Sequence, residues 1–212
     1  MSSVEDEGDL TGRANIRNAA LRLFAERGHD AVTMREIAAA AGVSPALVVH
    51  HFGSKDGLRA AVDGHAARAF DALFEMDGQD LAGALSGDGA VSVAEMIARA
   101  FPHGSPLPAY LRRLLLVNDP AGAALFGRWY ALTRRLLDTM TELGVARPAG
   151  DPAVRAAFLL VNDLALILLR NQVAAAIGVD PLTPEGVTRW AEEVTAVYTQ
   201  GAFLSTPGEE RS

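Results

Sequence analysis

Residues 33–58 read TMREIAAAAGVSPALVVHHFGSKDGL, and this stretch decides the fold of the amino-terminal part of the chain. Thr33, followed three residues later by Glu36, forms a capping box that begins a short helix. Gly42 ends this helix because glycine can adopt a left-handed conformation in a tight turn, and Ser44-Pro45 begins a second one. The spacing predicts a helix-turn-helix, although an ordinary pair of packed helices fits the same pattern.

Helix signals continue through the rest of the chain. A residue able to cap a helix is followed by proline at Ser105-Pro106, Asp119-Pro120, Asp151-Pro152 and Thr183-Pro184. Thr11 begins a helix with one apolar stripe that ends at Gly28, and Ser54 begins another that runs to about Met76. Because no segment shows strand alternation at useful length, we expect an all-α protein of about nine helices. The glycine-rich and aspartate-rich segment 77–90 predicts a loop between two parts.

The composition excludes several classes of protein. The chain has 212 residues and no cysteine, which removes disulfides, thiolate nucleophiles and zinc-finger sites. Its start, MSSVEDEGDL, lacks the features of a signal peptide. The longest apolar stretch, residues 156–169, is too short and too polar in its middle to span a bilayer. We therefore expect a cytoplasmic protein without a membrane partner.

The charges are unevenly distributed along the chain. The net charge is -7, but residues 10–60 carry seven basic and four acidic residues, a local charge of +3. Residues 1–9 carry -4 and residues 61–212 carry -6. A basic segment next to an acidic body is compatible with DNA binding, and ordinary surface scatter would give a difference of this size as well.

The amino-terminal run resembles the TetR family of bacterial transcriptional regulators. The matching residues are Leu23-Phe24-Ala25-Glu26-Arg27-Gly28, Thr33 with Arg35, Ile37 and Ala38, Ala41-Gly42-Val43-Ser44, His51-Phe52 and Ser54-Lys55. The resemblance implies a homodimeric all-helical repressor with an amino-terminal DNA-binding domain. It also implies a carboxy-terminal domain that holds a small-molecule pocket and the dimer interface.

These implications set the expected domains and function. We expect a disordered acidic tail at residues 1–9, a helix-turn-helix domain at 10–53, a connecting helix at 54–76, a ligand-binding and dimerisation domain at 77–204, and a tail at 205–212. The expected function is that of a sequence-specific repressor that a small apolar effector releases from a palindromic operator. The expected repressor is not an enzyme and needs neither a cofactor nor a metal.

The expected DNA contacts lie in and around the second helix of the motif. Lys55, the only lysine, follows the cap Ser54, so its ammonium and the helix amino terminus could meet one phosphate. Val49 stands where the family usually has a phosphate-contacting tyrosine. His50 is expected to face the groove, and His51 to be packed or to face a phosphate. The full set is Thr33, Arg35, Ser44, Pro45, Ala46, Leu47, His50, His51 and Lys55.

The expected effector pocket uses side chains with an apolar body and a polar tip. The candidates are Met96, Phe101, Tyr110, Leu114, Phe126, Trp129 and Tyr130, with Asn162 and Asp163 supplying polarity. The alternative is that these aromatic residues are simply core. The two polar residues must then find partners among neighbouring side chains, water or a ligand.

The long helix that begins near Val154 has two apolar faces and so needs two packing partners. The expected dimer interface consists of Val154, Phe158, Val161, Leu168, Trp190, Val194 and Val197. A monomer could instead use both faces internally.

The rival function is a helical dimer that binds a small molecule or a protein and has weak or lost DNA binding. An enzyme ranks third, because no phosphate loop, paired metal-binding histidines or nucleophile elbow is present.

Overall fold

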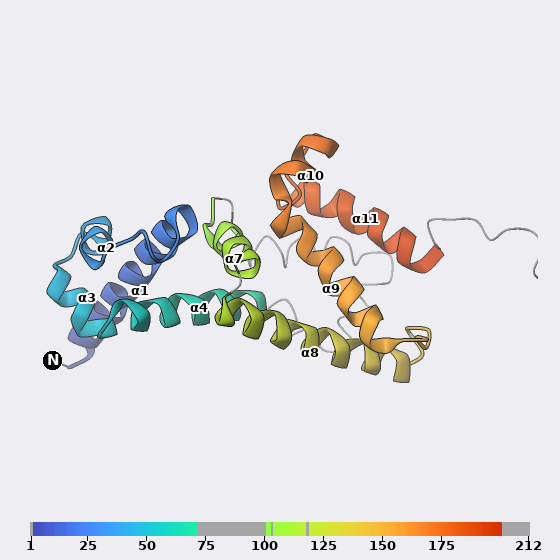
Figure 1. Ribbon diagram of the computed structural model, residues 1–212, viewed down its shortest axis with the longest axis horizontal. Coiled ribbons are helices and arrows are strands. Elements are labelled where there is room, and N and C mark those ends of the chain that lie inside the picture. Colours follow the sequence, from blue (N-terminus) through green and yellow to red (C-terminus); the bar gives the residue numbers. More distant parts are fainter. Residues whose placement is uncertain (1, 72–100, 103, 118, 201–212) are drawn as a thin grey trace, which may run out of the picture.

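The described part of the chain consists of nine helices and contains no strand, which confirms the all-α prediction (Figure 1). The structure is a computed structural model, and it describes residues 2–71, 101–102, 104–117 and 119–200. The helices are α1 (Ser2–Arg27), α2 (Met34–Ala41), α3 (Pro45–Phe52), α4 (Lys55–Asp71), α7 (Leu107–Leu116), α8 (Pro120–Glu142), α9 (Pro152–Leu168), α10 (Arg170–Ile177) and α11 (Pro184–Gln200).

The helix-turn-helix has the local structure that its sequence predicts. The Thr33 hydroxyl accepts from the Glu36 N–H at 3.2 Å, and the Thr33 N–H donates to the Glu36 carboxylate at 2.7 Å. Gly42 ends α2 with a φ of 70°, in the left-handed region. The Ser44 hydroxyl then accepts from the Leu47 N–H at 3.2 Å and begins α3. The capping box, the turn glycine and the second cap are all confirmed.

Helix α1 differs from the prediction at its start. It begins at Ser2, not at Thr11, so residues 2–9 belong to a helix and the prediction of a disordered acidic tail is wrong. Acidic residues are favoured in the first turns of a helix because they interact with the positive end of its dipole. The acidic segment is therefore compatible with a helix.

Most of the cap and proline pairs begin helices. Asp119 and Asp151 cap α8 and α9, and the Thr183 hydroxyl accepts from the Gly186 N–H at 3.2 Å at the start of α11. Helix α7 begins one residue later than predicted, with Pro106 in the cap position. The carboxyl end predicted for the connecting helix, the loop at 77–90 and the tail at 205–212 lie outside the described residues.

The helix-turn-helix domain forms one end of the molecule, and α4 runs from it towards α8 (Figure 1). A continuous core joins this domain to the body and includes Phe24, Leu58, Leu111 and Leu160. At the carboxyl end of α1, Arg113 from α7 donates to the Glu26 carbonyl at 3.2 Å. The helix-turn-helix end is thus packed directly onto the body.

The membrane prediction concerned residues 156–169, which fall mainly in α9. Among the described helices, no single one is long and apolar enough to cross a membrane. Only α9 and α10 together reach that length and apolarity, and their axes are bent by 81°.

We predict that Thr133→Val stabilises the protein. The Thr133 hydroxyl is buried on α8 and has no hydrogen-bond partner among the described residues. Valine has nearly the same shape without the unpaired polar group, so the free energy of unfolding should rise by about 1 kcal/mol in urea denaturation. Thr139→Val, at an exposed position of the same helix, is the matched control and should change it little. A loss of stability in Thr133→Val alone would show that the hydroxyl has a partner.

Candidate DNA-binding surface and effector groove

The outer face of α3 is solvent-exposed and uncharged. Pro45, Ala46, Val49 and His50 lie on it, while Val48 on the opposite face is fully buried. Leu47 is half-buried and packs against the core, so less of it is available to a base than the sequence predicts. The side chains on the exposed face could contact base edges mainly through apolar surface and one imidazole.

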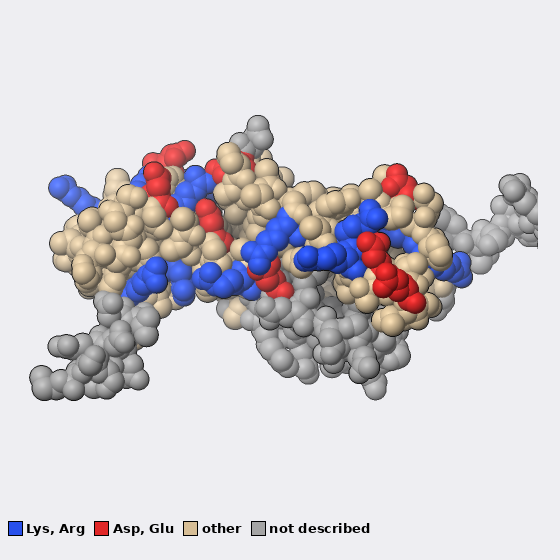
Figure 2. Space-filling view, turned by 90° about the horizontal axis from the view of Figure 1, so that it is seen from below, with Lys and Arg blue, Asp and Glu red and all other residues tan. Residues whose placement is uncertain are grey.

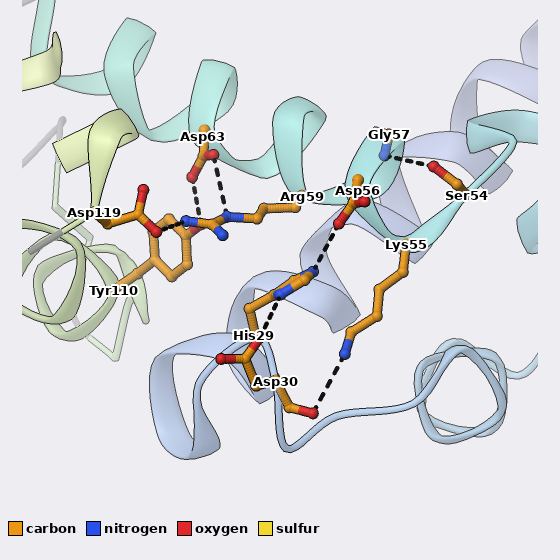
Figure 3. Close-up of polar contacts among 10 residues, drawn as sticks. All are labelled: His29, Asp30, Ser54, Lys55, Asp56, Gly57, Arg59, Asp63, Tyr110 and Asp119. Atoms are coloured by element: carbon orange, nitrogen blue, oxygen red, sulfur yellow. Dashed lines mark hydrogen bonds and ion pairs between the residues drawn. The ribbon is translucent and has the colours of Figure 1, made fainter. Parts of the chain in front are cut away.

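Polar and basic groups surround this face. Thr33 and Arg35 are exposed at the start of α2, and Ser44 is exposed at the start of α3. Lys55 begins α4, and its ammonium donates to the Asp30 carbonyl at 3.4 Å (Figure 3). This bond is long and exposed, so the ammonium could leave it for a phosphate at little cost.

The two consecutive histidines face different surroundings. His50 is exposed, whereas His51 is half-buried and lies against Gly12 of α1. Of the two roles expected for His51, packing is the one that this position favours. Across the described residues, no group of three or more His, Asp or Glu side chains could hold a metal ion.

Electrostatic contacts also fix the motif to its neighbours. Glu36 pairs with Arg27 at 2.8 Å, and its hydrogen bonds from Thr33, followed by the one from Arg27, lower its pKa to about 2. The carboxylate therefore stays charged over the whole physiological range, and the capping box persists there.

A polar junction joins α4 to the body (Figure 3). Arg59 of α4 pairs with Asp119, the cap of α8, and lies 3.7 Å from Asp63. The Tyr110 hydroxyl of α7 donates to Asp63. Burial raises the pKa of Asp63, while the hydrogen bond from Arg59 lowers the pKa of Asp119. Three elements of the chain meet at these four side chains.

An apolar groove of about 360 Å³ lies between the end of α7, the start of α8 and α9. Its walls are Leu115, Leu116, Val117, Asp119, Gly122, Ala123, Phe126, Val161, Leu164 and Leu168. The volume falls within the range of small-molecule sites. Asp119 belongs both to this groove and to the junction with α4.

Only one of the predicted pocket residues, Phe126, lines this groove. Met96 lies outside the described residues. Phe101, Tyr110, Leu114 and Trp129 are buried in the core, as the alternative interpretation has it. The Tyr110 hydroxyl, expected as a polar tip towards ligand, is instead engaged with Asp63.

The remaining polar candidates lie on or near the α9 surface. Asn162 donates to the Tyr198 hydroxyl of α11 at 3.0 Å, so it finds its partner within the chain. Asp163 is still exposed to solvent, although desolvation by the surrounding protein raises its pKa to about 6. Tyr130 donates a long hydrogen bond of 3.4 Å to the Ala153 carbonyl.

Helix α9 has one buried and one exposed apolar face. Leu160, Leu164 and Ile167 are buried, whereas Val154 and Phe158 are each 63% exposed and Val161 is 51% exposed. We call these three exposed residues the α9 stripe. Leu168, Trp190, Val194 and Val197, which complete the predicted interface, are half-buried.

Sequence reasoning missed the groove walls on α7 and the buried Thr133. Leu115, Leu116 and Val117 read as the end of an apolar helix, and nothing in their spacing separates groove from core. Thr133 could have been found, because it continues the buried series Leu125 and Trp129 at a spacing of four residues.

A helix-turn-helix unit with an exposed second helix, joined by one helix to a larger helical body, defines a helix-turn-helix transcriptional regulator. Residues 16–62 match the family described as bacterial regulatory proteins of the tetR family. Residues 103–204 match the carboxy-terminal domain described as tetracyclin repressor-like. The chain belongs to the TetR family of bacterial transcriptional regulators, which confirms the resemblance.

Similar proteins cover most of the chain. The HTH-type transcriptional regulatory protein RaaS of Mycobacterium tuberculosis is 37% identical over 165 residues, covering 78% of this chain and 74% of RaaS. The HTH-type transcriptional repressor Rv3405c of the same organism is 32% identical, with coverages of 82% and 83%. The structure of AibR with isovaleryl coenzyme A and operator DNA has the same fold, with a TM-score of 0.56, 21% identity and coverages of 88% and 97%.

We predict that Tyr110→Phe weakens the junction. It keeps the buried ring but removes the hydrogen bond to Asp63, so the free energy of unfolding in urea should fall by about 1–2 kcal/mol at pH 8. The pKa of Asp63 in the folded protein, already raised, should rise further. The loss of unfolding free energy in Tyr110→Phe should therefore shrink as the pH falls, because the Asp63 carboxyl becomes protonated in both the folded and the unfolded protein.

Tyr130→Phe is the matched control, since it removes the same atom from a more exposed and longer hydrogen bond. Its effect should be below about 0.5 kcal/mol. Equal deficits in the two variants, or a deficit that does not change with pH, would contradict a role for the Tyr110 hydroxyl at Asp63.

Proposed function

We propose that this chain is a cytoplasmic, homodimeric, ligand-responsive repressor that acts by binding and not by catalysis. The observation that carries the proposal is the exposed outer face of α3, which begins at a capped amino terminus and is flanked by Arg35 and Lys55. Phosphate contacts from these flanks position the protein on DNA, and the α3 face reads the major groove.

The proposed operator contacts are the residues predicted from the sequence, but these residues do not all play the same part. In this proposal His50, Ala46 and Ser44, which are exposed, contact bases, whereas the half-buried Leu47 and His51 act mainly through packing. The rival function, a dimer with weak or lost DNA binding, draws support from the uncharged α3 face and from Val49, which is 50% exposed.

The proposed effector is a small, largely apolar compound bound in the groove between α7, α8 and α9. Asp119 connects this groove to DNA binding, because the same side chain holds Arg59 on α4. An effector that displaces the start of α8 would change the tilt of α4 and hence the separation of the two α3 helices. Effector and operator must then weaken each other's binding by the same factor.

The proposed dimer is formed through the α9 stripe, with the partly exposed face of α11 beside it. Covering Val154, Phe158 and Val161 would remove apolar surface from water, at about 1.5–3 kcal/mol for each fully buried side chain. The pairing of two subunits also matches the two-fold symmetry of a palindromic operator.

The test of DNA binding is a footprint and an anisotropy titration on the DNA flanking the gene of this chain. We predict that the protein protects a specific sequence within this DNA from cleavage in the footprint. Lys55→Ala should reduce the magnitude of the slope of log affinity against log salt by roughly 2 per dimer, at about 0.9 per phosphate contact.

Val49→Tyr should tighten binding about threefold to tenfold by adding a phosphate-contacting hydroxyl. Absence of any complex at low salt would favour the rival function.

We predict that Phe158→Asp dissociates the dimer and thereby abolishes tight operator binding. A charge in the centre of an apolar interface has no partner and is costly to bury. Sedimentation equilibrium measures the association state. Ala131→Asp, at an exposed position of α8, introduces the same charge outside the α9 stripe and should leave the dimer intact. An intact Phe158→Asp dimer would place the interface elsewhere.

A further inference from the structure

A second cleft, of about 330 Å³, lies between α1 and α4 beside the helix-turn-helix. Three arginines from the two helices line it: Arg13 and Arg17 from α1, and Arg68 from α4. In the space-filling view, Lys and Arg side chains form a row along the amino-terminal half of the molecule (Figure 2). We call the cleft that these three arginines line the α1–α4 cleft.

Among the described residues, the three arginines of the cleft have no acidic partner, unlike several other arginines. Arg27, Arg59 and Arg170 each pair with a carboxylate. Within the described part of the chain, no carboxylate lies within 4.0 Å of the guanidinium groups of the cleft. Arg17 instead donates to the amide oxygen of Asn18 at 3.0 Å. Among the side chains that the structure describes, no carboxylate neutralises the positive charge gathered at the cleft.

The other two guanidinium groups are positioned by neutral surroundings. The Arg13 guanidinium lies 5.4 Å from the centre of the Phe52 ring, a cation–π contact at the end of α3. The Arg68 side chain turns back along α4, with one nitrogen 3.4 Å from where a Cβ of Gly64 would lie. Both side chains are solvent-exposed, and both line the cleft.

The charges in the cleft act on one another. Burial, followed by the charges of Arg68 and Arg13, lowers the pKa of Arg17. Burial also lowers the pKa of the neighbouring His65, and the charges of Arg17 and Arg68 add to this effect. Like charges held together in a partly buried site repel one another, and a bound anion would relieve that repulsion.

The shape of the cleft suits a small oxyanion. Ala60, Ala61 and Gly64 line the α4 side, and these small side chains leave the space between the helices open. Guanidinium groups present planar pairs of donors that match phosphate oxygens. We propose that the α1–α4 cleft binds a phosphate group through Arg13, Arg17 and Arg68.

Two sources could supply this phosphate. Phe52 lies at the end of α3, so the cleft adjoins the proposed operator surface, and a backbone phosphate of DNA is one source. A free phosphorylated compound is the other, since the cleft has the volume to enclose more than a single phosphate. The binding chemistry is the same in both cases.

The first experiment uses pyrophosphate as the probe, with the full chain at constant ionic strength. Calorimetry should show saturable binding that Arg17→Ala and Arg68→Ala each weaken at least fivefold. Arg22→Ala removes one charge from an exposed position of α1 outside the cleft and should leave binding unchanged. Bound pyrophosphate should raise the Tm by roughly 3 °C at ten times its Kd, and the cleft variants should lose this rise.

The second experiment identifies the source with duplex DNA. If the ligand is a backbone phosphate, Arg17→Ala and Arg68→Ala should each reduce the salt slope of DNA binding by roughly 0.9 per subunit, and pyrophosphate should compete with DNA. If it is a free phosphorylated compound, the variants should lose pyrophosphate binding with the slope unchanged. The proposal is overturned if the variants alter neither pyrophosphate binding nor the salt slope. The pyrophosphate experiment needs no operator, so it can succeed even where the proposed repressor function fails.

Discussion

The carboxylate of Asp119 connects the parts of this molecule on which the proposed regulation depends. It accepts from the Ala121 N–H at 2.8 Å and so starts α8, it pairs with Arg59 of α4, and it borders the apolar groove. The ion pair is partly exposed, and such pairs contribute little net stability. A contact of this kind can be rearranged by a ligand more easily than a packed apolar core, which is what a connection between effector and DNA requires.

In the surface around α3, the residues that supply affinity for DNA differ from those that supply specificity. Its outer face carries no Lys, Arg, Asp or Glu, so hydrogen-bond readout of bases is limited to a few residues. Basic side chains lie on α1, α2 and the start of α4, where phosphate contacts supply affinity regardless of sequence. In the proposed repressor, discrimination would depend on apolar contacts and on the shape of the DNA more than on charged pairs. The overall charge of -7 belongs mostly to the body and says little about this surface.

The sequence predicts local structure well and long-range partners poorly. Caps, prolines and the turn glycine act within four residues, so the helix starts and the helix-turn-helix follow from reading the chain. The Tyr110 hydroxyl meets Asp63 across 47 positions, and Asn162 meets Tyr198 across 36. Nothing local marks such pairs, and for that reason Tyr110 was expected to face a ligand. The sequence does not predict the α1–α4 cleft, because Arg13 and Arg68 are 55 positions apart and each resembles an ordinary surface arginine.

Val161 links the proposed effector site to the proposed dimer. It lines the apolar groove and also belongs to the α9 stripe, so one side chain borders both surfaces. In the proposed dimer, the partner subunit covers this edge of the groove and excludes water from a bound effector. Effector affinity then depends on dimerisation, and by linkage the effector stabilises the dimer to the same extent. An effector that expands the groove would press on the dimer contact through Val161 and on α4 through Asp119. Loss of operator binding would then follow from a changed spacing within an intact dimer, since dissociation would oppose the stabilisation that the effector itself provides.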